Sequence, residues 1–162
     1  LPTRAEWLKA YWGGNEGSNF FPWPSSGGRD SDHINGSFGN YNNSDDPWDD
    51  NVANPDFAWE TTPVSYYDGS QTPTGVDMAN GFGLYDVYGN VSEWCWDRSF
   101  SNWYNEPEAQ DDNSKGPNSG LGRTRCSYGL SWNDYGYSTT GSSYFSDTTV
   151  YSFLGFRTVR SR

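Results

Sequence analysis

The sequence predicts a single domain built from short antiparallel or mixed strands, with few helices and much loop. A chain of 162 residues suits one domain with a sizeable core. The 19 glycines and 9 prolines, together with many Asn, Ser and Asp residues, favour turns over long elements. Aromatic residues make up 19% of the chain and hydrophobic residues only 33%, so Trp, Tyr and Phe must provide most of the packing.

The formal net charge of −11 restricts the partners of the chain. It argues against nucleic acid and against an anionic membrane surface. It suits calcium and a secreted or cell-surface location, although a solvated acidic face is the alternative. No stretch has the length of a transmembrane span or the pattern of a signal peptide, so we expect no membrane insertion. Because the chain starts without Met, any targeting sequence would lie upstream.

One helix is predicted, over the stretch "TRAEWLKAYW". Thr3 can cap its first turn, and Glu6, three residues on, can complete a capping box. The expected apolar face consists of Ala5, Leu8 and Trp12. The glycines at 13 and 14 end the helix.

Short runs rich in aromatic and β-branched residues predict the strands. They cover residues 62–67, 92–97, 123–132, 148–153 and 155–160. The stretch from residue 15 to about residue 60 is dominated by Asn, Asp, Ser, Gly and Pro, which indicates a long ordered or ion-organised loop region. No internal repeat and no second domain is visible.

Several motifs occur in the order typical of one family. They are "LPTRAEW" at the start, "PWP" at 22–24, "TTPV" at 61–64, "GFGLYDVYGNVSEWCWD" at 81–97, "SW" at 131–132 and "GFR" at 155–157. The chain resembles the sulfatase-modifying factors, the family of formylglycine-generating enzymes. The resemblance implies an α+β domain with the irregular C-type-lectin-like fold of that family. It also implies that the chain is the C-terminal part of a larger domain.

The central block of this resemblance implies a structural calcium ion. Its ligands would be Asp86, the carbonyls of Gly89 and Val91, Glu93 and, in support, Asn90. Carboxylate, amide and carbonyl oxygens are the ligands that calcium prefers. The alternative is that Asp86 and Glu93 cap turns or bind an arginine such as Arg157.

A second calcium site of the family would fall in the loop region. Asn40 and the carbonyl of Tyr41 match its first half. Its acidic ligand would be Asp56 or Asp50, within a stretch that looks like an insertion.

The catalytic cysteines of the family are missing. The resemblance implies that active enzymes of this family carry two cysteines, four residues apart, between the "SW" and "GFR" motifs. These cysteines would bind copper, since a thiolate pair suits Cu(I). This chain has no cysteine between Trp132 and Gly155, so we expect no copper. Cys95 and Cys126 lie elsewhere and are expected to be small buried residues. A disulfide between them is the alternative.

Other catalytic patterns are also absent from the sequence. His33 is the single histidine and cannot build a histidine-based metal site. No GxSxG, P-loop or HExxH motif occurs. The residues therefore favour a non-catalytic protein, and a divergent formylglycine-generating oxidoreductase remains the alternative.

The segment of residues 133–153, "NDYGYSTTGSSYFSDTTVYSF", has an unusual composition. Each of its residue types can be reached from the Asn codons AAC and AAT by changing adenines. In this position it resembles the variable region of proteins diversified by adenine-directed retroelements, which display changeable side chains on a lectin-like fold. Ordinary low complexity is the alternative.

This segment predicts a binding face for a protein or glycan ligand. Tyr with Ser, Gly and Asn is the mixture that antibody loops use. The predicted contact residues are Asn133, Asp134, Tyr135, Tyr137, Thr139, Ser142, Tyr144, Phe145, Asp147 and Tyr151. "WND" at 132–134 adds a calcium-dependent glycan binder as a further alternative. The expected core anchors are Trp94, Trp96, Trp132 and Phe156.

Overall fold

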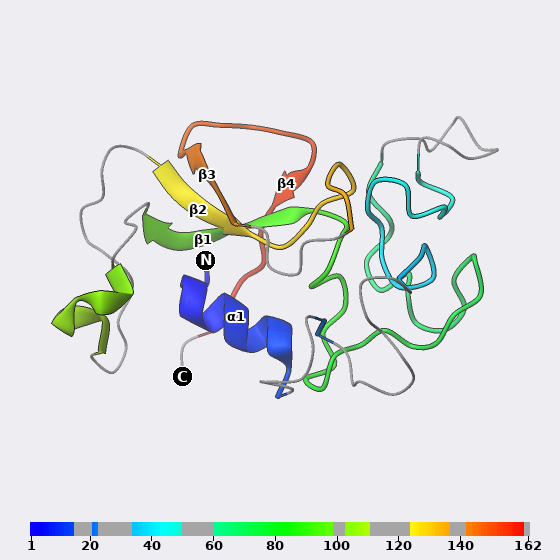
Figure 1. Cartoon of the computed structure of the whole chain (residues 1–162), viewed down its shortest axis with the longest axis horizontal. Coiled ribbons are helices and arrows are strands. Elements are labelled where there is room, and N and C mark those ends of the chain that lie inside the picture. The colour runs from blue at the N-terminus through cyan, green and yellow to red at the C-terminus, as the bar shows by residue number, and fades with distance from the viewer. Residues whose placement is uncertain are drawn as a thin grey trace.

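The computed structural model describes residues 1–14, 21–22, 34–49, 60–98, 103–110, 124–136 and 142–160. Its main elements are helix α1 (Arg4–Trp12) and strands β1 (Ser92–Arg98), β2 (Thr124–Tyr128), β3 (Ser142–Ser146) and β4 (Leu154–Gly155). Two 3₁₀-helices, η1 (Trp103–Asn105) and η2 (Pro107–Gln110), follow β1. The strands form one sheet in the order β3-β2-β1-β4 (Figure 1). Only β1 and β4 run parallel, so the predicted mixed architecture is observed.

The predicted helix is confirmed, together with both of its ends. The Thr3 amide donates to Glu6 Oε2 at 2.7 Å, and Thr3 Oγ1 accepts from the Glu6 amide at 3.2 Å, which completes the capping box. Gly13 ends the helix in the left-handed conformation with φ of 56°. The expected apolar face is confirmed in part, because Leu8 and Trp12 pack half-buried against the core whereas Ala5 is exposed. The fully buried residues of the helix are Trp7 and Tyr11, which were not expected.

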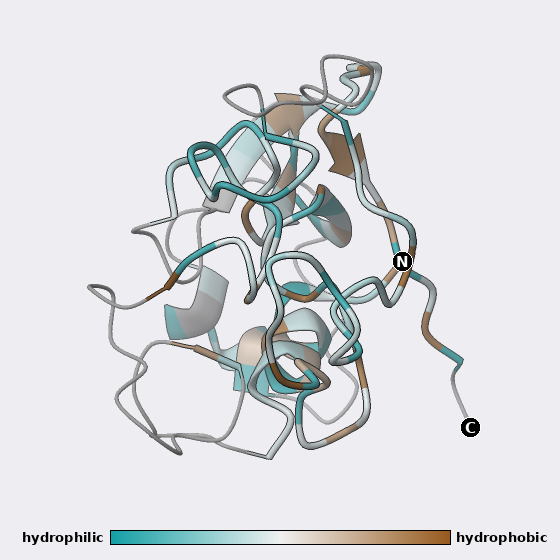
Figure 2. Ribbon diagram, turned by 90° about the vertical axis from the view of Figure 1, so that its right-hand side faces the viewer, coloured by the Kyte–Doolittle hydropathy of each residue, from teal (hydrophilic) through white to brown (hydrophobic). Residues whose placement is uncertain are grey.

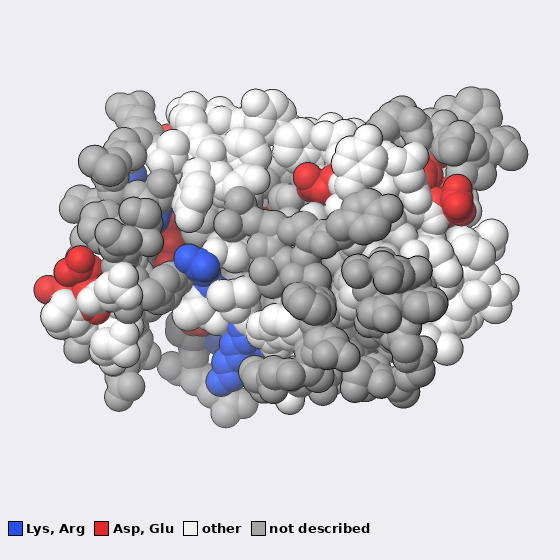
Figure 3. Space-filling view, in the orientation of Figure 1, with Lys and Arg blue, Asp and Glu red and all other residues white. Residues whose placement is uncertain are grey.

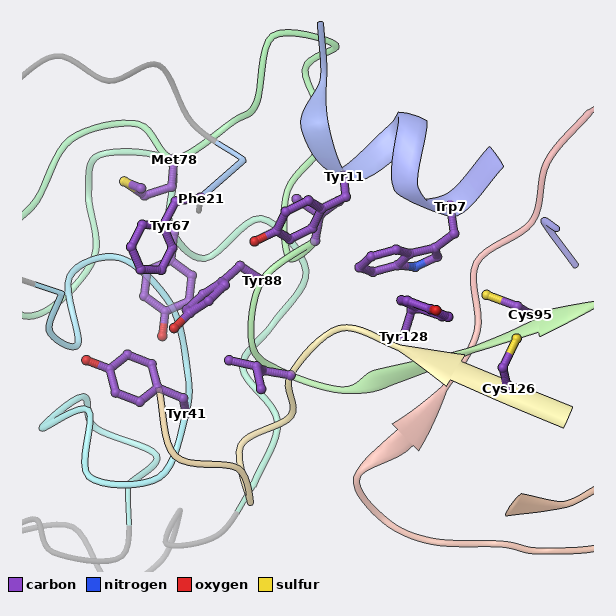
Figure 4. Packing of buried hydrophobic residues seen from close by; sticks show 12 residues of the cluster. Trp7, Tyr11, Phe21, Tyr41, Tyr67, Met78, Tyr88, Cys95, Cys126 and Tyr128 are labelled. Carbon is purple, nitrogen blue, oxygen red and sulfur yellow. The ribbon is translucent and has the colours of Figure 1, made fainter. Parts of the chain in front are cut away.

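Helix α1 packs against one face of the sheet through alternating residues of β1. Trp7 Nε1 donates to Glu93 Oε2 at 2.6 Å, and the Arg4 amide donates to Asp97 Oδ2 at 2.6 Å. The Trp7 ring lies 5.5 Å from that of Tyr128 on β2, as Figure 4 shows. Since side chains alternate along a strand, the even-numbered residues of β1 must face away from α1.

Two of the expected strands are turns. Residues 62–67 contain a turn closed by the Tyr66 amide and the Pro63 carbonyl at 3.1 Å, with Ser65 at φ of 62°. Residues 148–153 form turns as well, and the strand of this region is β3, a few residues earlier. Of residues 155–160, only Gly155 belongs to a strand.

Buried side-chain amides hold the loop region between α1 and β1. Gln71 Nε2 donates to the carbonyls of Ser37 and Val76, both at 2.9 Å. Asn80 Nδ2 donates to the Ala10 carbonyl at 2.6 Å, which fixes the loop region to the end of α1. This region faces the viewer in Figure 2 and is mostly teal or white, so it contains few aliphatic residues. Hydrogen bonds here complement the packing of the aromatic residues that the region contributes to the core.

The core differs from the expected one. Trp96 is 48% exposed and Phe156 is 67% exposed, so neither is a core anchor. Trp94 and Trp132 are half-buried. The buried apolar cluster consists of Trp7, Tyr11, Phe21, Tyr41, Tyr67, Met78, Val87, Tyr88, Cys95, Cys126, Tyr128 and Leu130. These residues lie between α1, the sheet and the loop region, whereas Trp96 and Phe156 point away from that space.

Within the described ranges, no helix has the length and apolar character needed to cross a membrane.

Candidate functional site

The Gly89–Asn90 turn joins three distant segments. Both residues have positive φ, at 80° and 65°. A Cβ on Gly89 would lie 2.4 Å from the Asn40 carbonyl oxygen, so only glycine fits there. The Asn90 amide donates to the Asn40 carbonyl at 2.8 Å, and its Oδ1 accepts from the Thr62 amide at 3.1 Å. The Asn90 carbonyl accepts from the Trp132 amide at 2.9 Å.

Glu93 is held by protein donors on both of its oxygens. Arg157 donates from Nε to Oε2 and from Nη2 to Oε1, each at 2.6 Å. Trp7 Nε1 also donates to Oε2. A bidentate arginine pair of this kind satisfies a buried carboxylate without a metal ion. The predicted alternative to calcium binding by Glu93, an ion pair with Arg157, is therefore the contact observed.

In the part of the chain that the structure describes, Asp86, unlike Glu93, has a hydrogen-bond donor on only one of its two carboxylate oxygens. Its Oδ2 accepts from the Ser65 amide at 3.0 Å, but its Oδ1 is buried and has no hydrogen-bond partner among the described residues. Burial raises the pKa of this carboxyl. The side chain also lines a cavity of about 10 Å³ beside Tyr67 and Met78. A cation would compensate Oδ1, so Asp86 fits the implied calcium ion and Glu93 does not.

The other implied calcium ligands are only partly brought together. The Asn40 carbonyl accepts from Asn90, and the Tyr41 carbonyl accepts from the Ser44 amide at 3.0 Å. Asp50 and Asp56 lie outside the described residues. The described ranges contain no group of three or more His, Cys, Asp or Glu residues suited to a metal ion.

The two cysteines are free, buried thiols on neighbouring strands. Trp94 of β1 pairs with Ser127 of β2, which places Cys95 and Cys126 next to each other on the side of α1 (Figure 4). A hydrogen bond with Cys126 and burial raise the pKa of the Cys95 thiol far above its usual value. A buried thiol of this kind is a poor nucleophile.

The first residues of the segment 133–153 are anchored to the loop region. Asp134 Oδ2 accepts from the amide and the hydroxyl of Ser131 at 2.9 and 2.6 Å, so this side chain closes a turn and does not point outward as expected. The Gly136 carbonyl accepts from the Tyr88 hydroxyl at 2.6 Å. Tyr135 between them is 62% exposed, and Asn133 is also exposed.

The sheet face opposite α1 carries a continuous set of aromatic rings. Ring centroids lie 6.1 Å apart for Trp94 and Phe145, 5.5 Å for Phe145 and Tyr151, and 4.8 Å for Tyr151 and Phe153. Trp132 continues the set at 6.5 Å from Phe153. We call this surface the aromatic face; its members are Trp94, Trp96, Trp132, Phe145, Tyr151 and Phe153. The turns between β3 and β4 contribute two of its rings (Figure 1).

The predicted contact residues are divided between two sides of the sheet. Phe145 and Tyr151 belong to the aromatic face. Tyr144 pairs with Cys126 across β2 and β3, so it lies on the side of α1, at the sheet edge, with 46% exposure. Asp147 follows β3 and is exposed. Tyr137, Thr139 and the side chain of Ser142 lie outside the described residues.

Sequence reasoning missed the part of this surface that the scaffold strands supply. The sequence predicts Trp94 and Trp96 in the core and predicts no role for Arg125 at a binding surface. The Arg125 guanidinium carbon lies 4.8 Å from the centroid of the Trp96 ring. The signal was present in "SEWCWDR", where acidic and Cys residues alternate with Trp and Arg, as in a strand with two different faces.

The fold and its motifs agree with comparisons with known proteins. The family described as "Sulfatase-modifying factor enzyme 1-like domain" matches this chain over residues 1–162. The chain belongs to the sulfatase-modifying factor family.

Three relatives show how far the similarity extends. The chain is 33% identical over 113 residues to the chaperone protein LppX of Paenibacillus barcinonensis, covering 69% of this chain and 34% of the relative. It is 31% identical over 124 residues to the formylglycine-generating enzyme of Thermomonospora curvata, covering 76% and 35%. Among solved structures, Treponema denticola variable protein 1 is similar with a TM-score of 0.59 and 25% identity, covering 96% of this chain and 45% of that one. The chain thus spans about a third of the length of these curated relatives.

Proposed function

We propose that this chain is a non-catalytic ligand-binding domain of the sulfatase-modifying factor family. Its binding surface consists of the aromatic face and the adjoining exposed residues of the segment 133–153. The ligand is a protein or a glycan. The competing proposal is a divergent oxidoreductase that acts on protein cysteine.

The single observation that carries this proposal is the exposed aromatic face. Six aromatic rings of the described residues lie on one sheet face that α1 does not cover; Trp96 and Tyr151 are 48% and 47% exposed, and the other four are half-buried. The surface over β3 and the turns toward β4 is mostly white in Figure 3, hence almost free of charged side chains. Contiguous exposed aromatic surface is typical of interaction sites.

Diversification of this surface is supported by two further observations. The segment 133–153 contains only residue types reachable from Asn codons through adenine changes. A protein named as variable, from Treponema denticola, shares the fold over 96% of the chain. The anchors at Asp134 and Gly136 would let neighbouring side chains vary while the backbone stays in place.

The cysteines support binding over catalysis. The segment between Trp132 and Gly155 contains no thiol, and Cys95 and Cys126 are buried on the opposite side of the sheet from the aromatic face. Copper-dependent oxidation of a substrate cysteine needs thiolate ligands that the substrate can approach. Two buried thiols with a raised pKa at Cys95 do not offer them.

A structural calcium ion at Asp86 is part of the proposal. The buried Oδ1 without a partner is the observation that supports it. The ion would offset the cost of burying the carboxylate. Glu93 is not included, because Arg157 and Trp7 occupy both of its oxygens.

A displayed library tests the binding proposal directly. Asn133, Tyr135, Asp147 and Tyr151 are randomised on the otherwise unchanged chain, and binders are selected against several unrelated proteins and glycans. The matched control randomises four exposed residues of the loop region instead: Val64, Thr74, Val76 and Phe82. Specific binders from the first library alone would support the proposal. Equal numbers of specific binders from the two libraries, or binders from the control library alone, would contradict the proposal.

A further inference from the structure

We propose that the aromatic face binds arginine-bearing segments of a partner polypeptide. The inference rests on the proposed binding function and names the chemistry of its ligand. It combines the charge of the whole chain with the geometry of the rings. Tyr151 and Phe153 are the side chains that carry it.

The net charge of the whole chain favours a cationic ligand through long-range attraction. The chain carries 21 acidic and 10 basic residues, for a net charge of −11. Within residues 133–153 the only charged side chains are Asp134 and Asp147. Asp147 is exposed next to the end of β3, where an ion pair with a partner would be open to solvent. The negative potential of the chain attracts cations and raises the rate at which they associate with the protein.

The protein already places its own guanidinium groups on aromatic rings. Arg125 lies over Trp96 at 4.8 Å, at one end of the aromatic face. Arg4 lies over Tyr128 at 5.0 Å on the other side of the sheet. Cation–π attraction of this type favours arginine, because its planar group also stacks on the ring. The rings of β3 and the following turns offer comparable surface for a ligand.

The stacked pair of Tyr151 and Phe153 is the proposed contact point. Their ring planes are inclined by 12°, and Tyr151 is 47% exposed. Phe145 lies against both rings, at 5.5 and 6.3 Å. Packing fixes these rings in advance, so little side-chain entropy is lost when a guanidinium stacks on Tyr151. A polypeptide with spaced arginines could contact several rings at once.

Calorimetry with short peptides tests this inference. The probes are a Gly/Arg peptide and, at equal length, Gly/Ser and Gly/Glu peptides. The Gly/Arg peptide is expected to bind, more weakly at high salt, and the other two are not. The Tyr151→Leu variant keeps an apolar side chain but loses the ring. It should weaken binding of the Gly/Arg peptide about two- to fivefold, the range of an exposed cation–π contact.

Two matched variants separate the ring from its surroundings. Tyr151→Trp should keep or increase affinity, and Phe82→Leu, at an exposed ring of the loop region, should leave it unchanged. Equal binding of the Gly/Ser peptide, or an unchanged affinity in Tyr151→Leu, would overturn the inference. If the library yields binders through this surface but the unchanged chain does not prefer the Gly/Arg peptide, the inference fails and the proposed function stands. If no binder uses the surface, both fail.

Discussion

Asn90 lies where three segments of the chain meet. Its backbone and side chain bind Asn40, Thr62 and Trp132, and its left-handed φ of 65° is one that Asn tolerates better than most residues. A polar residue inside "GFGLYDVYGNVSEWCWD" thus has a role in the fold that requires no ligand. Its amide ties together loops whose aromatic residues reach the core.

Replacement of Asn90 tests this role. Asn90→Ala removes the side-chain bonds to Thr62 and forces a Cβ residue into the left-handed region. We expect a loss of about 2–4 kcal/mol in unfolding free energy, measured by urea denaturation. Asn90→Gly is the control, because it loses the same bonds without the strain and should cost roughly 1 kcal/mol less. Equal stability of all three proteins would contradict the assignment.

Asp86 provides the test for calcium. Chelator is expected to lower the melting temperature of the wild type, since an ion bound only to the folded state adds to its stability. Asp86→Ala should remove that difference. An unchanged melting temperature of the wild type with chelator would mean that Asp86 only accepts from the Ser65 amide in a turn.

At the scale of elements, α1 is joined to β1 by polar contacts as much as by packing. Trp7 packs against Tyr128 and donates to Glu93, which Arg157 also binds. The helix, a central strand and the C-terminal segment therefore share one buried carboxylate. Removing one partner of a buried ion pair lowers stability by more than the pair contributes, because the other charge stays buried without compensation.

Trp7→Phe tests the link between helix and sheet. The variant keeps an aromatic ring but loses the Nε1 donor to a buried carboxylate. The expected cost is about 2–4 kcal/mol in thermal or chemical unfolding. Trp12→Phe, at a half-buried position on the same helix, should cost about 1 kcal/mol or less. Similar losses for both variants would show that the hydrogen bond contributes little.

The sequence predicted those elements whose signals are local. The capping box at Thr3 and Glu6 predicted α1, and "SEWCWD" predicted β1. It did not predict the turns at 62–67 and 148–153, because a short aromatic run looks the same in a strand and in a packed turn. Nor did it predict that Trp96 is exposed, since burial depends on which sheet face α1 covers. That choice arises from the contacts of Trp7 with Glu93 and Tyr128, which are distant in sequence.

At the scale of the whole molecule, the chain combines a buried scaffold with an exposed aromatic surface. α1, the sheet and the amide-held loops enclose both cysteines and five of the tyrosines. The aromatic face lies on the other side of the sheet. Family membership alone does not decide between enzyme and binder, because some relatives are named as formylglycine-generating enzymes.

Copper loading tests the competing oxidoreductase proposal. The purified protein with copper is expected not to convert the cysteine of a sulfatase-type peptide to an aldehyde, as followed by mass spectrometry. The reason is that residues 133–154 contain no thiol. Turnover above that of copper alone, and lost in Cys126→Ser, would reverse the assignment and make Cys126 a displaced ligand.

The separation of scaffold and binding surface is tested most directly by comparing two variants by thermal melting. Tyr135, Tyr144 and Tyr151, at 62%, 46% and 47% exposure, are changed together to Ser; in the second variant only Tyr11, fully buried, is changed to Ser. Exposed substitutions cost about half a kcal/mol each, whereas truncation of a buried aromatic residue costs roughly 3–5 kcal/mol. The account predicts that the triple variant melts close to the wild type and well above Tyr11→Ser. A triple variant that unfolds at or below the temperature of Tyr11→Ser would contradict it, because those rings would then belong to the scaffold.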